Sequence, residues 1–326
     1  FIYSFGSEED DFTDKLKEQG CNYISITDLN IEDAVNLIRN DQIDIAIDLM
    51  GYTKRNRMSI FSYRIAPIQI NYLGYPSTSG AKSINYLIAD KVIIPLENQK
   101  YYSEKILYMP NSYMPYSNKT EISKNIFTRK EFGLKDDAFI LAAFHSTQKI
   151  TTKEINSWSR ILGRITNATL WISYTNKIAE RNIKDQFRKR GIEEGRIIFS
   201  KRIESRKDHL SRHSCADLFI DTFNYNGHST TIDSLWTGLP VVTLMGESFS
   251  ARVTSSFLST LNLKQLIASD VKQYEDIVIE LANDRKKLAN LKNELIVSKK
   301  TNPLFDSSRH TRDLECIFQG LVNNYL

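Results

Sequence analysis

The feature that most constrains the fold is a regular alternation of short apolar runs and polar helical segments through residues 138–261. Strands with few polar residues, separated by helices, indicate a parallel sheet that is covered on both faces. The predicted strands are Ala138–Phe144, Thr169–Tyr174, Arg196–Ser200, Asp217–Thr222 and Pro240–Leu244, and the predicted helices are Thr152–Ile165, Ala179–Arg190, Arg206–His213, Ser229–Thr237 and Phe249–Leu261.

The first third of the chain alternates in the same way and then becomes irregular. From Gly51 to Pro115 it is rich in Gly, Pro, Tyr, Ser and Asn. We predict an α/β protein with two Rossmann-like lobes and a cleft between them, because open parallel sheets bind ligands at the carboxyl ends of their strands. The predicted strands here are Phe1–Phe5, Asn22–Ile26, Ile43–Leu49, Gln69–Leu73 and Tyr86–Ala89, and the predicted division is 1–122 for a partial first lobe, 123–300 for the second lobe and 301–326 for a C-terminal helix that packs across both.

Composition and charge exclude several classes of protein. The 326 residues carry a net charge of only +4, without the clustered basic stripe that a nucleic-acid surface needs. No apolar run approaches the ~20 residues that span a bilayer. The cysteines Cys21, Cys215 and Cys316 are odd in number and far apart, which favours a reducing, cytoplasmic compartment. The chain starts with Phe1 inside an apolar run, so we expect it to be a fragment.

The predicted helix after Asp217–Thr222 has the features of an anion site. It follows the turn Phe223–Gly227, and its first turn carries hydroxyl side chains and unpaired backbone N–H groups, which suit a phosphate or diphosphate. Asp233 lies four residues after Ser229 on the same side, where a carboxylate can accept ribose hydroxyls. An ordinary helix capped by Ser or Thr would show the same residues.

Two further clusters carry charge near the same sheet edge. Arg206, His209 and either Arg212 or His213 share one helical face, where imidazole can stack on a base and guanidinium can bond carbonyl oxygens. A solvated basic face is the alternative. Lys149 follows the strongest predicted strand, where it would meet a leaving phosphate, although one loop lysine is weak support.

The order and spacing of these clusters resemble a known family, the O-linked N-acetylglucosamine transferases or family 41 glycosyltransferases, in a bacterial version. The resemblance extends from about residue 40 to the C-terminus. It is carried by Asp48–Lys54, Arg64–Gln69, Leu73–Gly80, Tyr102–Lys105, Tyr108–Pro110, Asn226–Thr230, Gly246–Val253 and Pro303–Phe305.

The resemblance implies a GT-B fold and an enzyme that moves N-acetylglucosamine from UDP-N-acetylglucosamine to serine or threonine hydroxyls of a protein acceptor. Lys149 and the helix near Ser229 would stabilise the UDP leaving group as its charge develops. We expect neither a metal nor another cofactor, because fixed positive groups would replace a divalent cation. We expect no nucleic-acid or membrane partner.

By position, the resemblance also assigns roles to single residues. Lys149 matches the lysine on the donor phosphates and His209 the histidine that stacks on the nucleoside, and we count both as candidate catalytic residues. Lys54 lies near the acceptor side. The candidate donor-binding residues are Arg206 and Arg212 near the base, His228, Ser229, Thr230 and Asp233 on ribose and diphosphate, Ser146 before the lysine, and Gly74 and Pro76 in the sugar pocket.

Departures from the family keep alternatives open. His145-Ser146-Thr147-Gln148 replaces an Asn-containing stretch, and Ser77 replaces a common glycine in the sugar-pocket loop. The family's first catalytic strand and its acceptor-recruiting tetratricopeptide repeats would precede Phe1, so we expect this chain to bind UDP and to transfer poorly alone. The alternatives are a transferase with another UDP-hexose or another acceptor, including Asn, and a non-catalytic domain that binds UDP or a partner.

The remaining histidines and the tryptophans have a simpler interpretation. His213 and His310 are expected to be packing or surface residues, and the sequence leaves the role of His145 open. Trp158, Trp171 and Trp236 lie in regular elements, so we expect them in the core.

Overall fold

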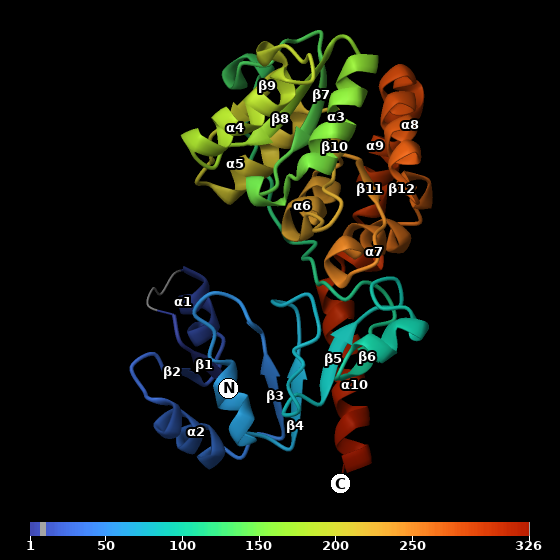
Figure 1. Cartoon of the computed structure of the whole chain (residues 1–326). Helices are drawn as coiled ribbons and strands as arrows, with labels where there is room; N and C mark the ends of the chain where they lie inside the picture. The colour runs from blue at the N-terminus through green and yellow to red at the C-terminus, as the bar shows by residue number, and fades with distance from the viewer. Residues whose placement is uncertain (7–10, 326) are drawn as a thin grey trace. The chain divides into compact units, whose positions relative to one another are not determined.

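The computed structural model describes residues 1–6 and 11–325 (Figure 1). The chain divides into two compact units. The first unit contains residues 1–88, 99–107 and 318–326, and the second contains residues 89–98 and 108–317. The lobe boundary expected between residues 122 and 123 stays a prediction.

The second unit is built on a six-stranded sheet in the order β12-β11-β10-β7-β8-β9, in which every neighbouring pair is parallel. Every side chain of β7 is buried, as a strand covered on both faces requires. The predicted strands are confirmed with shifted ends, whereas β12 was missed. The strands are β7 (Phe139–Ala143), β8 (Ala168–Ser173), β9 (Ile197–Ser200), β10 (Leu218–Ile220), β11 (Val241–Leu244) and β12 (Ile267–Ala268).

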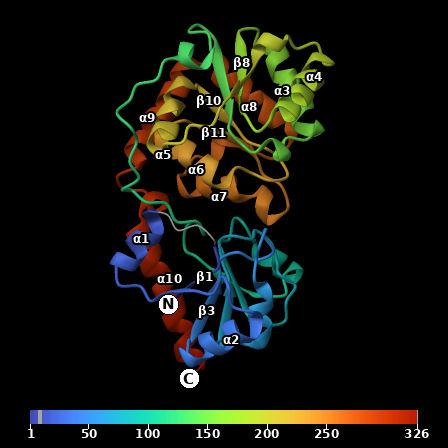
Figure 2. The same ribbon diagram turned by 90° about the vertical axis from the view of Figure 1, so that its left-hand side faces the viewer.

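Helices cover both faces of this sheet. On one face α3 lies against α4 and α8, and on the other α6 lies against α5 and α9 (Figure 2). Trp158, Trp171 and Trp236 are buried, so their assignment to the core is confirmed. The helices are α3 (Thr152–Arg164), α4 (Lys177–Arg188), α5 (Arg206–Ser211), α6 (His228–Thr237), α7 (Val253–Thr260), α8 (Val271–Asn283) and α9 (Arg285–Ser298).

The first unit contains a four-stranded sheet in the order β3-β4-β5-β6 and a separate parallel pair, β1-β2. A core of aliphatic side chains, including Val35 and Ile38 of α2, packs beneath Tyr3 and Phe5. The short β6 was missed because it lies within the irregular stretch. The elements are β1 (Ile2–Ser4), α1 (Asp11–Glu18), β2 (Tyr23–Ser25), α2 (Ile31–Asn40), β3 (Ile45–Asp48), β4 (Ile68–Asn71), β5 (Tyr86–Ala89) and β6 (Lys105–Tyr108).

The C-terminal helix α10 runs unbroken over Ser307–Tyr325. Leu326 lies outside the described residues, and the packing of this helix across the lobes stays a prediction. Within the described part of the chain, no helix is both long and apolar enough to cross a membrane.

The strand order fixes where a ligand site belongs in the second unit. The chain runs from β7 to β8 and β9 in one direction, and from β10 to β11 and β12 in the other. The helices that follow β7 and β10 therefore leave on opposite faces, and open parallel sheets bind ligands at the carboxyl ends of two such adjacent strands. The segments that follow β7 and β10 are Phe144–Lys149 and Asp221–Gly227.

Candidate functional site

The turn after β10 is organised by the buried carboxylate of Asp221. Its Oδ1 accepts hydrogen bonds from the backbone N–H groups of Thr222 and Gly227, both at 2.9 Å, and its Oδ2 accepts one from the Thr243 hydroxyl at 2.9 Å. His145 Nε2 lies 2.8 Å from Oδ1, and both side chains of this pair are fully buried. Burial opposes ionisation of Asp221, but the hydrogen bond and charge of His145 outweigh it and lower the pKa of the carboxyl.

Two more side chains fix the same turn from other elements. Glu154 of α3 accepts the Phe223 N–H at 2.9 Å while it also closes the capping box at the start of its own helix. Asn226 donates from its side-chain amide to the Thr222 carbonyl at 2.7 Å, and its N–H donates to the Ser250 carbonyl at 2.8 Å. The turn is therefore held in one conformation by groups from several elements.

The turn ends at the amino end of α6. This helix begins at His228, and its N-cap is Gly227, which provides no side-chain hydrogen bond. The interpretation of α6 as a helix capped by its own Ser or Thr is therefore wrong. A Cβ at Gly227 would lie 2.6 Å from Thr231 Oγ1 and 2.9 Å from the His145 ring, so the close packing here requires glycine. Gly238, at φ +87°, ends the helix as predicted.

Lys149 reaches this turn from the end of the 3-10 turn Thr147–Lys149 that follows β7. Its Nζ donates to the Asn226 carbonyl at 2.8 Å and lies 4.0 Å from the centroid of the Tyr225 ring. Burial lowers the pKa of Lys149 to about 8, and the Asp221 carboxylate acts against that shift. Ser146, at the start of the same 3-10 turn, is exposed. A cation is thus fixed beside the amino end of a helix, which suits an anion.

Asp233 and Arg206, predicted in separate clusters, form one contact. Arg206 Nη2 lies 2.8 Å from Asp233 Oδ1, and the Tyr116 hydroxyl donates to the same oxygen at 2.7 Å. The Asp233 side chain is only 7% exposed, whereas that of Arg206 is 56% exposed. Burial raises the pKa of Asp233, against the hydrogen bond from Tyr116 and the charge of Arg206. Of the hydroxyl residues on this helix, Ser229 is exposed and Thr230 is half-buried.

The basic face of α5 is only partly solvated. Arg212 is buried, donates to Ser200 Oγ and the Lys201 carbonyl at 3.1 Å each, and lies with its guanidinium 4.3 Å from the Phe144 ring centroid. The interpretation as a solvated face is therefore wrong for this residue. His209 is half-buried, and burial, followed by the nearby arginine charges, lowers its pKa to about 4. Its imidazole is therefore neutral near pH 7.

His213 and His310, expected to be packing or surface residues, are both buried and therefore packing residues. The His213 ring meets that of His209 edge-on at 5.2 Å, and its Nδ1 lies 2.9 Å from the His209 carbonyl oxygen. Since a carbonyl only accepts, Nδ1 of His213 carries the proton. The His213 ring thus packs against the His209 ring and supports it.

Three predicted site residues lie in the first unit. Gly74 and Pro76 belong to the loop after β4, and Lys54 is an exposed residue in the loop after β3. A Cβ at Gly74 would lie 1.9 Å from the Leu49 carbonyl oxygen, so only glycine fits there. The buried Glu104 fixes this loop, because its carboxylate accepts the Ser79 N–H and the Thr78 hydroxyl, both at 2.6 Å.

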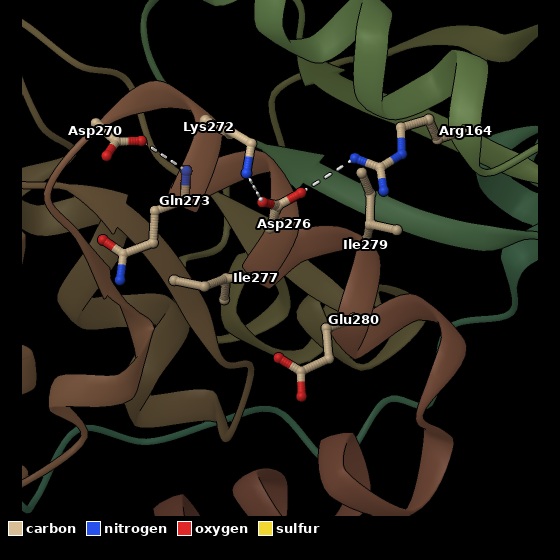
Figure 3. A pocket seen from close by; sticks show the side chains of 8 residues that line it. All are labelled: Arg164, Asp270, Lys272, Gln273, Asp276, Ile277, Ile279 and Glu280. Atoms are coloured by element: carbon tan, nitrogen blue, oxygen red, sulfur yellow. Dashed lines mark hydrogen bonds and ion pairs between the residues drawn. The ribbon is translucent and has the colours of Figure 1, made fainter.

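A hollow of about 630 Å³ lies elsewhere on the second unit, beside α8 and the end of α3 (Figure 3). Asp276 pairs with Arg164 at 3.1 Å and with Lys272 at 3.2 Å within its lining, so these charges already have partners. Among the described residues, no group of three or more His, Cys, Asp or Glu side chains converges as metal ligands would.

Comparison with known proteins decides the family. The model of glycosyl transferase family 41 matches residues 1–118 and 115–314. The chain belongs to this family. A probable UDP-N-acetylglucosamine–peptide N-acetylglucosaminyltransferase of Arabidopsis thaliana is 32% identical over 322 residues, with 97% of this chain and 33% of that protein covered. The corresponding transferase of Caenorhabditis elegans is 25% identical over 438 residues and covers 100% of this chain.

The fold of this family 41 chain also matches solved structures. A mutant O-GlcNAc transferase of Thermobaculum terrenum aligns with a TM-score of 0.90 at 25% identity, over 99% of this chain and 61% of that one. The Anabaena protein Alr3699/HepE, solved in complex with UDP-glucose, aligns with a TM-score of 0.63 at 12% identity, over 97% of this chain and 90% of that one, which shows the fold alone. The predicted GT-B fold is thereby confirmed. The chain spans about a third of the length of the plant proteins it matches.

Several residues that build the site were missed by the sequence argument. Asp221 was read only as the end of a strand, although a carboxylate after an apolar run was the signal available. The Thr151-x-x-Glu154 capping box is visible in the sequence, but the second bond from Glu154 to the distant turn is not. The contacts of Tyr225 with Lys149 and of Tyr116 with Asp233 carried no spacing signal, because the partners lie far apart in the chain.

Proposed function

We propose that this chain carries the donor site of a transferase that moves N-acetylglucosamine from UDP-N-acetylglucosamine to serine or threonine hydroxyls of a protein. One observation carries the proposal. In a family 41 chain, the Lys149 ammonium is fixed at the turn that leads into α6. This turn lies at the carboxyl ends of β7 and β10, where the strand order reverses. The plant and nematode relatives, which are named as UDP-N-acetylglucosamine–peptide transferases, support this donor and acceptor.

The chemistry at this edge suits departure of UDP. Negative charge grows on the diphosphate as the bond to the sugar breaks, and groups fixed in advance stabilise it most effectively. Lys149 supplies a charge, and the first turn of α6 supplies backbone N–H groups together with the side chains of Ser229 and Thr230. The exposed Ser146 hydroxyl offers one more donor. We propose that these groups act without a metal ion, so transfer should persist in excess EDTA.

The nucleoside end would occupy the neighbouring residues. His209 is neutral near pH 7 and half-exposed, so its ring can stack on uracil without carrying charge. Arg212 already bonds to Ser200 and contacts the Phe144 ring, so we propose that it supports the residues around His209. Asp233 offers a carboxylate for ribose hydroxyls, held by Arg206 and Tyr116. A reducing, cytoplasmic location fits the three free cysteines.

Isothermal titration with UDP tests the proposal. Lys149→Ala should weaken UDP binding by roughly tenfold to a hundredfold, since a hydrogen bond to a charged group contributes ~1.5–3 kcal/mol. Lys153→Ala is the matched control, because it removes the same charge from an exposed position nearby and should leave the affinity unchanged. Equal affinities for the two variants would refute the role of Lys149.

The nature of the sugar needs a separate comparison. We expect UDP-N-acetylglucosamine to bind this chain more tightly than UDP-glucose. The reverse order would favour a transferase with another hexose, and UDP binding without transfer by the whole protein would favour a binding domain.

A further inference from the structure

The Lys149 ammonium lies between two neutral groups. Its Nζ donates to the Asn226 carbonyl at 2.8 Å and lies 4.0 Å from the centroid of the Tyr225 ring. A cation within about 6 Å of an aromatic ring centroid is attracted by the negative face of the ring. The backbone of the turn and the side chain of Tyr225 thus fix the position of this cation together.

The Tyr225 ring is itself held in place. It stacks on the His228 ring with centroids 4.9 Å apart and planes inclined by 19°. The Tyr225 backbone carbonyl accepts the Thr222 hydroxyl at 2.6 Å. The ring is still 37% exposed, so it lies at the surface of the site and not in the core. A fixed ring at a surface can orient a neighbour that a ligand must reach.

The contact with the Tyr225 ring opposes the effect of burial, which disfavours the charged form of Lys149. Burial favours the neutral amine and, against the charge of Asp221, lowers the pKa of Lys149 to about 8. The groups that interact with it are Asp221, which is itself paired with His145, the His228 imidazole and the Tyr225 ring. Asp221 favours the ammonium, whereas burial, followed by the charge of Lys149, lowers the pKa of His228 to about 4 and keeps that ring neutral. The nearest groups, Tyr225 and the Asn226 carbonyl, stabilise the ammonium without any charge of their own.

We propose that Tyr225 is a positioning residue whose ring face holds Lys149 as a charged ammonium at the start of α6. A carboxylate in this place would form an ion pair that an incoming phosphate has to break. A ring face and a carbonyl leave the full charge of Lys149 available to a phosphate, because neither is an anion. This inference rests on the proposed function only in the assignment of Lys149 to the donor phosphates.

A series of rings of equal shape tests the inference on the free protein. Tyr225→Phe keeps the ring face, and a fluorinated phenylalanine at position 225 keeps the shape but weakens the negative face. The pKa of Lys149 is read from the pH dependence of its acetylation by a limiting amount of acetic anhydride, quantified by mass spectrometry. We expect Tyr225→Phe to match the natural protein and the fluorinated ring to lower the pKa by roughly half a unit to one unit.

Lys153 serves as the internal reference in every sample, because it is exposed and its acetylation should not depend on the ring at position 225. An unchanged Lys149 curve across the ring series would overturn the inference. UDP titration at pH 7 and pH 9 then separates the positioning role of Tyr225 from the proposed donor site. If the Lys149 curve moves with the ring but Lys149→Ala binds UDP normally, the positioning role stands and the donor-site proposal fails.

Discussion

Two segments are fixed in the same way but differ in the charge around them. They are the loop after β4 in the first unit and the turn after β10 in the second. Each is organised by one buried carboxylate that gathers N–H and hydroxyl groups. The partners of Glu104 are Ser79, Thr78 and Ser103, which are neutral donors. Asp221 lies against His145 and in the field of Lys149. Rigidity is therefore common to both segments, and what distinguishes the turn after β10 is the fixed Lys149 cation, at which we propose that an anion binds.

Asp221→Asn should have the largest effect. It removes the charge from a pair whose side chains are both fully buried, and breaking such a pair by changing one partner costs ~3–5 kcal/mol. Urea unfolding followed by tryptophan fluorescence reports on it, since all three tryptophans lie in the second unit. Asp276→Asn, an exposed carboxylate on α8, is the control and should cost less than ~1 kcal/mol. Equal losses would mean that the Asp221 charge does not organise the turn.

Acid should destabilise the second unit selectively, because all five histidines lie there. Four of them have a pKa lowered by burial from 6.5 to about 3 or 4, so the unfolded chain binds more protons than the folded chain between about pH 6.5 and 4. Stability therefore falls as the pH falls through this window, by roughly 1 kcal/mol per histidine at pH 5.5. The four residues are His209, His213, His228 and His310.

The buried carboxyls Asp90 and Asp233 act in the opposite direction, because burial raises the pKa of each and so favours the folded state in acid. Only two carboxyls oppose the four histidines, so we expect the second unit to be less stable at pH 5.5 than at pH 7. Urea unfolding at pH 7 and pH 5.5, again followed by tryptophan fluorescence, measures it. A second unit that is equally stable at both pH values would contradict the account.

Glu104→Gln should have the smallest effect. An amide keeps one accepting oxygen and can donate to the loop hydroxyls, so we expect a local loss of only ~1 kcal/mol. Hydrogen exchange of peptides covering residues 68–80 should accelerate by about fivefold, while the affinity for UDP stays unchanged. If Glu104→Gln weakened UDP binding as strongly as Lys149→Ala, the contrast between the two loops would be lost.

The alternation of elements and the family motifs were readable from the sequence, because periodicity and glycine placement are local properties. The amino end of α6, Gly238 at its end and Lys149 beside its start were all found in this way. The sequence could not show that Arg206 and Asp233 share one contact, since their side chains meet only after folding. It also left open a solvated face for Arg212, because a basic residue at helical spacing does not reveal that the side chain is buried against aromatic rings.

Buried carboxylates were the hardest features to foresee. Asp221, Glu154 and Glu104 each bond to backbone N–H groups of a turn or loop, and two of them reach segments distant in the chain. The short strands β6 and β12 were missed for a related reason. β6 lies in the irregular stretch and β12 is only two residues long, so tertiary pairing and not local pattern defines them.

The melting temperature of this chain in excess UDP, with UMP and ADP as controls, shows whether the chain binds UDP through Lys149 and α6. A ligand at about a hundred times its dissociation constant adds ~2.7 kcal/mol, which raises Tm by several degrees at this size. The account predicts a rise with UDP that exceeds the rise with UMP or ADP and that disappears in Lys149→Ala. A cooperative transition that UDP does not move would contradict a donor site at Lys149 and α6.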